Sequence, residues 1–226
     1  MKRKIELITT SDGSHSLYLP DMNETYHSSH GALTESQHIF IEAGLQSYLN
    51  EHPRKPLKIL EIGFGTGLNA LLTLRYALEH QVSIHFVSLE PFPLQEDVYG
   101  VLNYASLFTD EHANAQFLAL HEAEWETEVS ISDFFVLQKK EQRLEDFSDD
   151  TDFDLIFFDA FAPSKQEELW TYEILEKTVG LMGSSAVLVT YCARGQFKRD
   201  LAALGLRVET LPGPPGKKEM VRAVKL

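Results

Sequence analysis

The stretch KILEIGFGTGLNALL, from Lys58 to Leu72, joins an apolar run to three glycines spaced two residues apart. Each glycine costs conformational entropy on folding, so three of them directly after a strand need a compensating role. The pattern predicts a buried strand, a tight turn and a helix whose free N–H groups face a bound ligand. We expect Gly63 to let the chain leave the strand, Gly65 to leave room for a ligand, and Gly67 to open the helix.

Two acids accompany this turn. Glu61 precedes it, giving E-x-G-x-G-x-G, and Glu90 ends the next predicted strand, 23 residues after Gly67. In a nucleotide-binding α/β fold, an acid at the second place holds the two hydroxyls of a ribose. The alternative is a tight strand–helix turn with a surface acid. A nucleoside ligand would be NAD or S-adenosylmethionine, and NAD sites prefer G-x-G-x-x-G, so the spacing favours S-adenosylmethionine.

The rest of the chain alternates strand-like and helix-like segments, which predicts an α/β fold with a mostly parallel, doubly wound sheet. The last two strands are joined by PGPPGKK, which is too short for a parallel crossover, so the sheet should end in an antiparallel pair. Predicted strands lie at 58–62, 83–90, 153–161, 186–191, 206–211 and 219–226, with a hairpin at 125–140 and helices at 34–49, 69–79, 94–108, 111–124, 165–182 and 195–204.

The chain shows no internal repeat, low-complexity tract or long linker. Its first thirty residues read as short strands and turns. In the helix that follows, Thr34 stands three residues before Gln37, which is the spacing of a capping box. We therefore expect one domain, residues 1–226, on which the N-terminal strands and helix of residues 1–50 are packed.

The composition is that of a soluble globular protein, since 43% of the 226 residues are hydrophobic and 24% are charged. The charged start is not followed by the apolar core of a signal peptide, and no apolar run approaches the roughly 20 residues that cross a bilayer. Cys192 is the only cysteine, which excludes an internal disulfide and fits a reducing compartment. We expect a cytoplasmic protein without a membrane partner.

The net charge of −14 argues against a general attraction to nucleic acid. The charge is unevenly distributed, however. Residues 194–226 contain eight bases and three acids, a net of +5, which suits a local anion-binding surface. Residues 122–154 contain twelve acids and three bases, which we interpret as a solvated face.

A second group of candidate residues lies in FFDAFAPSKQEELW, from Phe157 to Trp170. This segment follows an apolar strand, and ligands of open α/β sheets bind at the carboxyl ends of strands. Asp159 is the first polar residue there and can accept a proton or orient an amine. Phe161 is placed to stack on a flat ring, and Pro163 to stiffen the loop. The alternative is that Asp159 caps the next helix while Phe161 belongs to the core.

Four motifs in order resemble the bacterial family of tRNA 5-aminomethyl(-2-thio)uridine methyltransferases, which comprises the methyltransferase domain of MnmC and its stand-alone form MnmD. They are TYHSSHGALTESQHIFIEAG, the glycine turn, FFDAFAPSKQEELW and PGPPGKKEMVRA, and they span nearly all of the chain. In the first motif, Tyr26, Ser28, Gly31 and Glu35 fall at the family's marked positions. The resemblance implies a class I S-adenosylmethionine-dependent fold. It also implies methylation of the uridine's amine at tRNA position 34, giving the 5-methylaminomethyl form.

The residues and the resemblance together define the expected sites. Asp159 is the expected catalytic residue, and no metal or flavin is expected. The cofactor is expected at Glu61, Gly63, Phe64, Gly65, Thr66, Gly67, Asn69, Glu90, Tyr26, Ser28 and Glu35. The tRNA substrate is expected at Phe161, Pro163, Arg194, Lys217 and Lys218. The two lysines stand in a Pro- and Gly-rich loop, where the alternative is that they only solubilise an exposed turn.

Two departures from the family pattern bear on these expectations. Two-domain members carry a flavin-dependent oxidase after this region, whereas this sequence ends at Leu226, so we expect methylation without removal of a carboxymethyl group. Family members also commonly close the third strand with an acid, but Lys139 or Lys140 stands near that place, which leaves the adenine contacts open.

Three other functions remain open at this stage. An NAD-dependent oxidoreductase would need G-x-G-x-x-G and a hydride-transfer acid–base residue. An aminopropyltransferase, or another small-molecule amine methyltransferase, would share the fold and use acids to bind a polyamine or amine. A non-catalytic tRNA-binding module would keep the basic C-terminal region without methyl transfer. The oligomeric state does not follow from the sequence.

Overall fold

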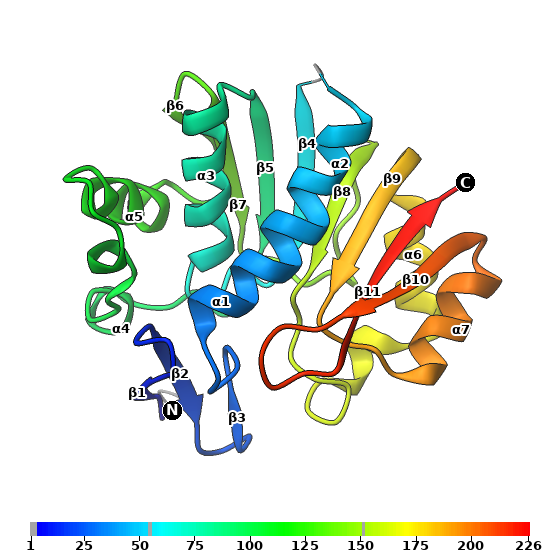
Figure 1. Ribbon diagram of the computed structural model, residues 1–226, viewed down its shortest axis with the longest axis horizontal. Helices are drawn as coiled ribbons and strands as arrows, with labels where there is room; N and C mark the ends of the chain where they lie inside the picture. The colour runs from blue at the N-terminus through cyan, green and yellow to red at the C-terminus, as the bar shows by residue number, and fades with distance from the viewer. Residues whose placement is uncertain (1–3, 54–55, 151) are drawn as a thin grey trace.

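A computed structural model describes residues 4–53, 56–150 and 152–226 of the protein. Within these residues, eight strands form the main sheet, in the order β10-β11-β9-β8-β4-β5-β7-β6 (Figure 1). They are β4 (Leu57–Ile62), β5 (Ile84–Leu89), β6 (Glu128–Ser132), β7 (Phe135–Lys140), β8 (Phe153–Phe158), β9 (Met182–Thr190), β10 (Leu206–Pro212) and β11 (Glu219–Lys225).

The centre of this sheet is parallel and its edges are antiparallel. Strands β9, β8, β4, β5 and β7 run parallel to one another. Strands β11 and β10 at one edge, and β6 at the other, run antiparallel to their neighbours. The predicted fold class, a mostly parallel doubly wound α/β sheet that ends in an antiparallel pair, is therefore confirmed.

Helices cover both faces of the sheet, because its central strands are apolar on both sides. Along β8, Leu155 and Phe157 pack in one core, whereas Ile156 and Phe158 pack in the other. The first core also contains residues of α1 (Ala32–Ser36), the π-helical segment η1 (Gln37–Gln46), α2 (Ser47–Glu51), α3 (Leu68–His80) and α5 (Ala113–Glu122). The second contains residues of α6 (Tyr172–Gly180) and α7 (Gly195–Ala203).

The chain between β5 and α5 is less helical than its sequence predicts. The helix predicted over 94–108 is replaced by two short helices, α4 (Glu96–Tyr99) and η2 (Tyr104–Leu107). Helix α4 ends at Gly100, because glycine is unfavourable inside a helix.

Another short helix, η3 (Glu167–Trp170), lies between β8 and α6. Across the described ranges, every helix is too short or too polar to traverse a lipid bilayer.

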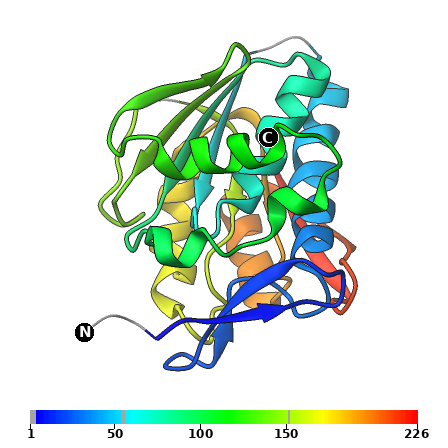
Figure 2. The ribbon, with the colours of Figure 1, turned by 90° about the vertical axis from the view of Figure 1, so that its left-hand side faces the viewer.

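A small antiparallel sheet lies at the carboxyl ends of the parallel strands. It consists of β1 (Glu6–Thr9), β2 (His15–Leu19) and β3 (Glu24–Thr25). Figures 1 and 2 show this N-terminal sheet at the same end of the protein as the loop between β10 and β11. Segments from both ends of the chain therefore meet where an open α/β sheet binds its ligands.

The helix after the N-terminal sheet begins earlier than predicted. Helix α1 starts at Ala32 with Gly31 as its N-cap, so the predicted capping box at Thr34 is wrong. The turn between β1 and β2 caps the helix instead. Ser14 Oγ accepts a hydrogen bond from the N–H of Ala32 at 3.0 Å, and Asp12 Oδ2 accepts one from the N–H of Thr34 at 2.9 Å. The N-terminal sheet thus fixes the start of the helix that carries Glu35.

Candidate active site

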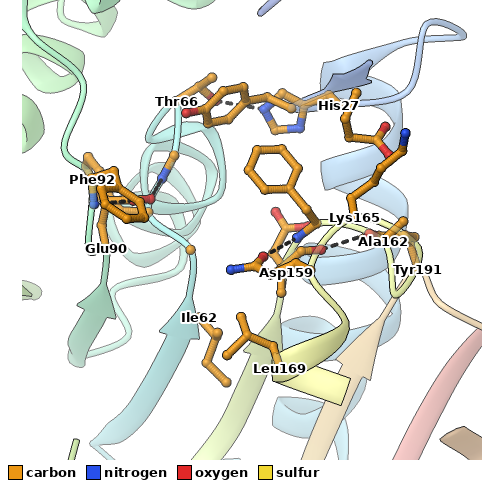
Figure 3. A pocket seen from close by; sticks show the side chains of 18 of the residues that line it. His27, Ile62, Thr66, Glu90, Phe92, Asp159, Ala162, Lys165, Leu169 and Tyr191 are labelled. Carbon is orange, nitrogen blue, oxygen red and sulfur yellow. Dashed lines mark hydrogen bonds between the residues drawn. The ribbon is translucent and has the colours of Figure 1, made fainter. Parts of the chain in front are cut away.

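A pocket of about 680 Å³ lies at the carboxyl ends of β4, β5 and β8 (Figure 3). The glycine turn follows β4, Glu90 follows β5 and Asp159 follows β8. The N-terminal segment completes the wall with residues 22, 24–29 and 35. Of the residues expected to bind the cofactor, Tyr26, Ser28, Glu35, Gly63, Phe64, Gly65, Thr66, Asn69 and Glu90 line this pocket. Glu61 and Gly67 lie outside its lining.

The glycine turn is compact because other segments press against it. Gly63 has φ +96°, and a Cβ atom there would lie 2.7 Å from the carbonyl oxygen of Asp159. Gly65 has φ +50°, and a Cβ atom would lie 3.1 Å from the Tyr26 ring. At both positions, the positive φ and the short Cβ distance disfavour any residue that carries a side chain. The room that we expected Gly65 to leave for a ligand is thus shared with Tyr26.

Glu90 connects the glycine turn to the end of β5. Its Oε2 accepts a hydrogen bond from the N–H of Gly65 at 3.0 Å, and its Oε1 accepts one from the N–H of Phe92 at 2.9 Å (Figure 3). The next helix, α3, has Gly67 as its N-cap and no side-chain cap. Its first-turn N–H groups are therefore not capped by a side chain, which suits an electron-rich ligand at this end of the helix.

Two buried oxygen atoms beneath the turn lack a hydrogen-bond partner among the described residues. Glu61 Oε2 accepts from Ser88 Oγ at 2.5 Å, but Glu61 Oε1 has no donor. Burial raises the pKa of Glu61 well above its usual range. Asn69 Nδ2 donates to Asp159 Oδ2 at 2.8 Å, and Asn69 Oδ1 is left without a donor. The amide oxygen Asn69 Oδ1 belongs to a pocket residue and is costly to bury unless a donor reaches it, so it favours a ligand that carries an N–H group.

Asp159 emerges from β8 into the pocket, where Figure 3 shows it between Glu90 on one side and Tyr191 on the other. Burial raises the pKa of Asp159 to about 7, and the negative charge of Glu35 adds to the effect. The Asn69 hydrogen bond and the Lys217 charge act in the opposite direction. A carboxyl group with such a pKa can both lose and accept a proton near neutral pH.

The same pKa leads to a prediction about stability. The folded protein holds a proton on Asp159 up to a pH of about 7, whereas the unfolded chain releases it near 3.8. Ionised Asp159 therefore destabilises the fold increasingly as the pH rises from about 4 to about 7. At about pH 8, we expect Asp159→Asn to unfold at higher urea concentration than the wild type. Its free energy of unfolding should be larger by at most about 4 kcal/mol, and this difference should disappear near pH 4.

The matched control is Asp133→Asn, because Asp133 lies exposed in the turn between β6 and β7. That variant should show no gap that grows with pH. A constant difference between Asp159→Asn and the wild type at all pH values would contradict a raised pKa at Asp159.

The loop after β8 is held in a defined conformation. The N–H of Phe161 donates to Gln166 Oε1 at 3.1 Å, and Trp170 Nε1 donates to the carbonyl oxygen of Phe161 at 2.8 Å. The Phe161 ring contacts the Tyr26 ring edge to face at 5.2 Å and lines the pocket. Gln166 and Thr171 are the N-caps of η3 and α6, which rules out the alternative that Asp159 caps the next helix.

The expected substrate residues divide between two places. Phe161 and Lys217 line the main pocket. Pro163, Arg194 and Lys218 line a more open hollow of about 430 Å³, which shares Ala162, Tyr191 and Lys217 with the main pocket. Lys218 is exposed, whereas the Lys217 side chain turns inward and forms an ion pair with Glu35. The two lysines, which the sequence treats alike, therefore have different surroundings.

Three pocket residues were missed in the sequence. Lys165 Nζ donates to the carbonyl oxygen of Met22 at 2.8 Å and so ties the loop after β8 to the N-terminal segment. His27 Nε2 lies 2.7 Å from Thr66 Oγ1, and burial lowers the pKa of His27 to about 4, so this histidine is neutral. The Tyr191 hydroxyl donates to the carbonyl oxygen of Ala160 at 2.8 Å.

Lys139, one of the two lysines expected near the end of the third parallel strand, lies outside the pocket lining. It is 1% exposed, its Nζ donates to the carbonyl oxygen of His121 at 2.6 Å, and burial lowers its pKa to about 8. The pocket wall after β7 is formed instead by residues 142–145.

Known proteins are similar to this chain in sequence and in fold. Residues 105–226 match a family described as S-adenosyl-L-methionine-dependent methyltransferase. The "tRNA 5-methylaminomethyl-2-thiouridine biosynthesis bifunctional protein MnmC" of Hydrogenovibrio crunogenus is 30% identical over 88% of the chain, and that of Burkholderia mallei is 30% identical over 95%. The chain spans about a third of the length of these relatives, 31% and 34% respectively.

Solved structures give the same result for the fold. MNMC2 from Aquifex aeolicus superposes with a TM-score of 0.81 at 25% identity, over 98% of this chain and 70% of its own. Spermidine synthase from Thermotoga maritima superposes with a TM-score of 0.54 at 17% identity, over 100% of this chain and 73% of its own. The second likeness concerns the fold alone.

Proposed function

Because the chain belongs to the family of S-adenosyl-L-methionine-dependent methyltransferases, we propose that it methylates the amine of 5-aminomethyl(-2-thio)uridine at tRNA position 34. The observation that carries this proposal is the position of Asp159, a partly buried carboxyl group that lines the same pocket as the adjacent glycine turn and accepts a hydrogen bond from Asn69 Nδ2 at 2.8 Å. The name of the MnmC relatives, which refers to tRNA 5-methylaminomethyl-2-thiouridine biosynthesis, supports tRNA as the substrate. A tRNA substrate would place the protein in the cytoplasm.

The residues of the pocket fit S-adenosylmethionine. The unpartnered acceptor Asn69 Oδ1 suits an ammonium group, and the Glu90 carboxylate suits two ribose hydroxyls. We assign the amino-acid end to the glycine turn, residues 63–67, with Glu61 and Asn69, and the ribose to Glu90. Tyr26, Ser28 and Glu35 would cover the site from the N-terminal segment. When bound, the cofactor supplies a methyl group that its sulfonium activates for transfer.

Asp159 prepares the substrate amine, which attacks only when it is unprotonated. As a carboxylate, Asp159 holds the ammonium form and then takes one proton from its nitrogen. Asn69 Nδ2, 2.8 Å from Asp159 Oδ2, orients the carboxylate. The carbonyl oxygen of Ala160, a further acceptor beside Asp159, already receives the Tyr191 hydroxyl. The other requirement is that the amine be aligned with the methyl group of the cofactor. The rings of Phe161 and Tyr26, which contact each other edge to face, would pack against the uracil and so position it.

We propose that the tRNA backbone follows the open hollow beside the pocket. The hollow is lined by Pro163, Arg194 and Lys218, and both basic residues are exposed. It is continuous with the pocket through Ala162 and Tyr191, so a nucleotide in the pocket would bring its neighbours to the hollow. An acidic protein can bind a polyanion through such a local basic surface.

This proposal predicts weaker and less salt-dependent tRNA binding in an Arg194→Ala/Lys218→Ala variant. Each lost phosphate contact should lower the slope of log affinity against log salt by roughly 0.7 to 0.9. The affinity for tRNA that carries 5-aminomethyluridine, whose amine is not yet methylated, is measured across several salt concentrations. The control is Lys58→Ala, which removes an exposed charge at the other end of β4. If the double variant and the control gave equal slopes, the hollow would not hold the tRNA, and the N-terminal segment around residues 26–35 would be tested next.

The function itself is tested by the product. The protein is incubated with methyl-labelled S-adenosylmethionine and tRNA that carries 5-aminomethyluridine, and the nucleosides are separated by mass spectrometry. We expect the label in 5-methylaminomethyluridine. A parallel reaction with decarboxylated cofactor and putrescine tests the aminopropyltransferase alternative. Aminopropyl transfer without tRNA methylation would overturn the proposal.

A further inference from the structure

Lys217 differs from its neighbour Lys218 in what its side chain contacts. Lys218 is exposed, whereas Lys217 Nζ forms an ion pair with Glu35 Oε1 at 2.5 Å. The same Nζ lies 3.8 Å from the centre of the Tyr191 ring, which is the geometry of a cation–π contact. Glu35 is 6% exposed, so the pair is largely shielded from solvent. Lys217 is therefore already engaged within the protein and is not a free ligand for phosphate.

These contacts bring three distant segments together beside Asp159. Glu35 comes from α1, Tyr191 follows β9, and Lys217 comes from the loop between β10 and β11. The Tyr191 hydroxyl reaches the carbonyl oxygen of Ala160, the residue directly after Asp159. Glu35, Tyr191, Lys217 and Asp159 all line the same pocket. The Lys217 ammonium is thus held from two sides at the wall that carries the candidate catalytic carboxylate.

We propose that Lys217 is a positioning residue that favours the ionised form of Asp159 for amine binding, and that Glu35 and the Tyr191 ring hold the Lys217 ammonium group in place. This inference rests on the proposed function, because only a carboxylate at Asp159 can hold and deprotonate the amine. It assigns different roles to the two neighbouring lysines. Lys217 serves the reaction centre, and Lys218 serves the tRNA backbone.

The charges around Asp159 support this assignment. Burial raises the pKa of Asp159 and Glu35 raises it further, whereas the Asn69 hydrogen bond and Lys217 lower it. The titratable groups whose charges interact with that of Asp159 come from five segments, and Lys217 is the cation among them. They are Glu61 on β4, Glu35 on α1, Tyr104 on η2, Tyr191 after β9 and Lys217 in the β10–β11 loop. Lys165 also lines the pocket, but its Nζ donates to the carbonyl oxygen of Met22.

Glu35 has a double effect in this arrangement. Its side chain holds Ser28 and Lys217 through two hydrogen bonds, since Oε2 accepts from the N–H of Ser28 at 2.8 Å and Oε1 accepts from Lys217 Nζ. Its charge, however, opposes ionisation of Asp159. Glu35 and Lys217 should therefore shift the titration of Asp159 in opposite directions. A pair with a purely structural role would not give opposite signs.

The test is a ¹³C NMR titration of the cofactor-free full chain, labelled at the aspartate carboxyl carbons. Asp159→Asn identifies the Asp159 signal. We expect Lys217→Met to raise the pKa of Asp159 by roughly 0.5 to 1 and Glu35→Gln to lower it by a similar amount. Lys217→Arg should restore a value near that of the wild type. The control is Lys218→Met, which should leave the Asp159 titration unchanged.

Two outcomes would overturn the inference. One is an unchanged Asp159 titration in Lys217→Met, with the fold confirmed by circular dichroism. The other is a shift of the same sign in Lys217→Met and Glu35→Gln, which would indicate a general rearrangement of the pocket. Neither outcome depends on methylation. Failure of the proposed function would appear as missing tRNA product with a normal titration, and so remains distinguishable.

Discussion

Replacing Asp159 with asparagine is expected to lower the rate of amine methylation by roughly 10²- to 10⁴-fold, the range of a general base. Asparagine has nearly the same shape as aspartate, and its amide oxygen can still accept the hydrogen bond that Asn69 Nδ2 donates at 2.8 Å. The fold and the cofactor affinity should therefore be retained. The measurements are single-turnover rates with saturating cofactor and calorimetric cofactor binding.

The pH dependence separates two possible roles of Asp159. Its pKa is raised to about 7 by burial, so the wild-type rate should rise with pH through about 7 as the carboxylate forms. Asp159→Asn should lose this limb if the carboxylate accepts the proton. If Asp159 only positions the amine, the loss should be smaller, and raising the pH should not rescue the variant selectively.

The control for this prediction is Asp133→Asn, which changes an exposed aspartate in the turn before β7, whereas the pocket residues 142–145 follow the other end of that strand. It should methylate at the wild-type rate. Wild-type turnover in both Asp159→Asn and Asp159→Ala would end the assignment of Asp159 as the catalytic residue.

The fold could be predicted from local sequence patterns. The apolar run before Gly63 predicts β4, and the alternation of strand-like and helix-like segments predicts the parallel sheet, because both patterns depend on sequence periodicity. The short PGPPGKK loop fixed the antiparallel end, since chain length alone decides that geometry. These predictions needed no knowledge of distant residues.

Two differences between the sequence-based predictions and the structure have another physical origin. The start of α1 was misplaced because its caps, Ser14 and Asp12, come from a turn about twenty residues earlier. Lys217 was grouped with Lys218 because turn lysines are usually exposed, yet Glu35 lies 182 positions away in sequence and beside it in space. Long-range pairs of this kind leave no local pattern to detect.

Part of the site could have been found by a rule already in use. Asp159 was identified because it follows an apolar strand at the carboxyl edge of the sheet. The same rule applies to Tyr191, which directly follows β9 and lines the pocket. Applied to every strand, it would have placed Tyr191 beside Asp159. It would not have found Lys165 or His27, which reach the pocket from a loop and from the N-terminal segment.

Removing the Glu90 carboxylate is expected to weaken S-adenosylmethionine binding by roughly 10²- to 10⁴-fold. In the proposed site this carboxylate accepts two ribose hydroxyls, and each charge-assisted hydrogen bond contributes roughly 1.5 to 3 kcal/mol. Glu90→Ala also removes the acceptor for the N–H groups of Gly65 and Phe92, at 3.0 and 2.9 Å. Glu90→Gln, which keeps one carbonyl oxygen, should fall between Glu90→Ala and the wild type. Calorimetry of cofactor binding measures both.

A second variant tests the same site through shape rather than charge. Gly65→Val would place a Cβ atom 3.1 Å from the Tyr26 ring at a φ of +50°, where a β-branched residue is strained. It should therefore distort the turn and block the pocket while Glu90 is intact. The control is Glu79→Ala, which removes an exposed acid near the far end of α3. Unchanged affinity in both Glu90→Ala and Gly65→Val would mean that neither the carboxylate nor the turn touches the cofactor. The assignment of this pocket as the cofactor site would then fail, whatever the fate of Asp159.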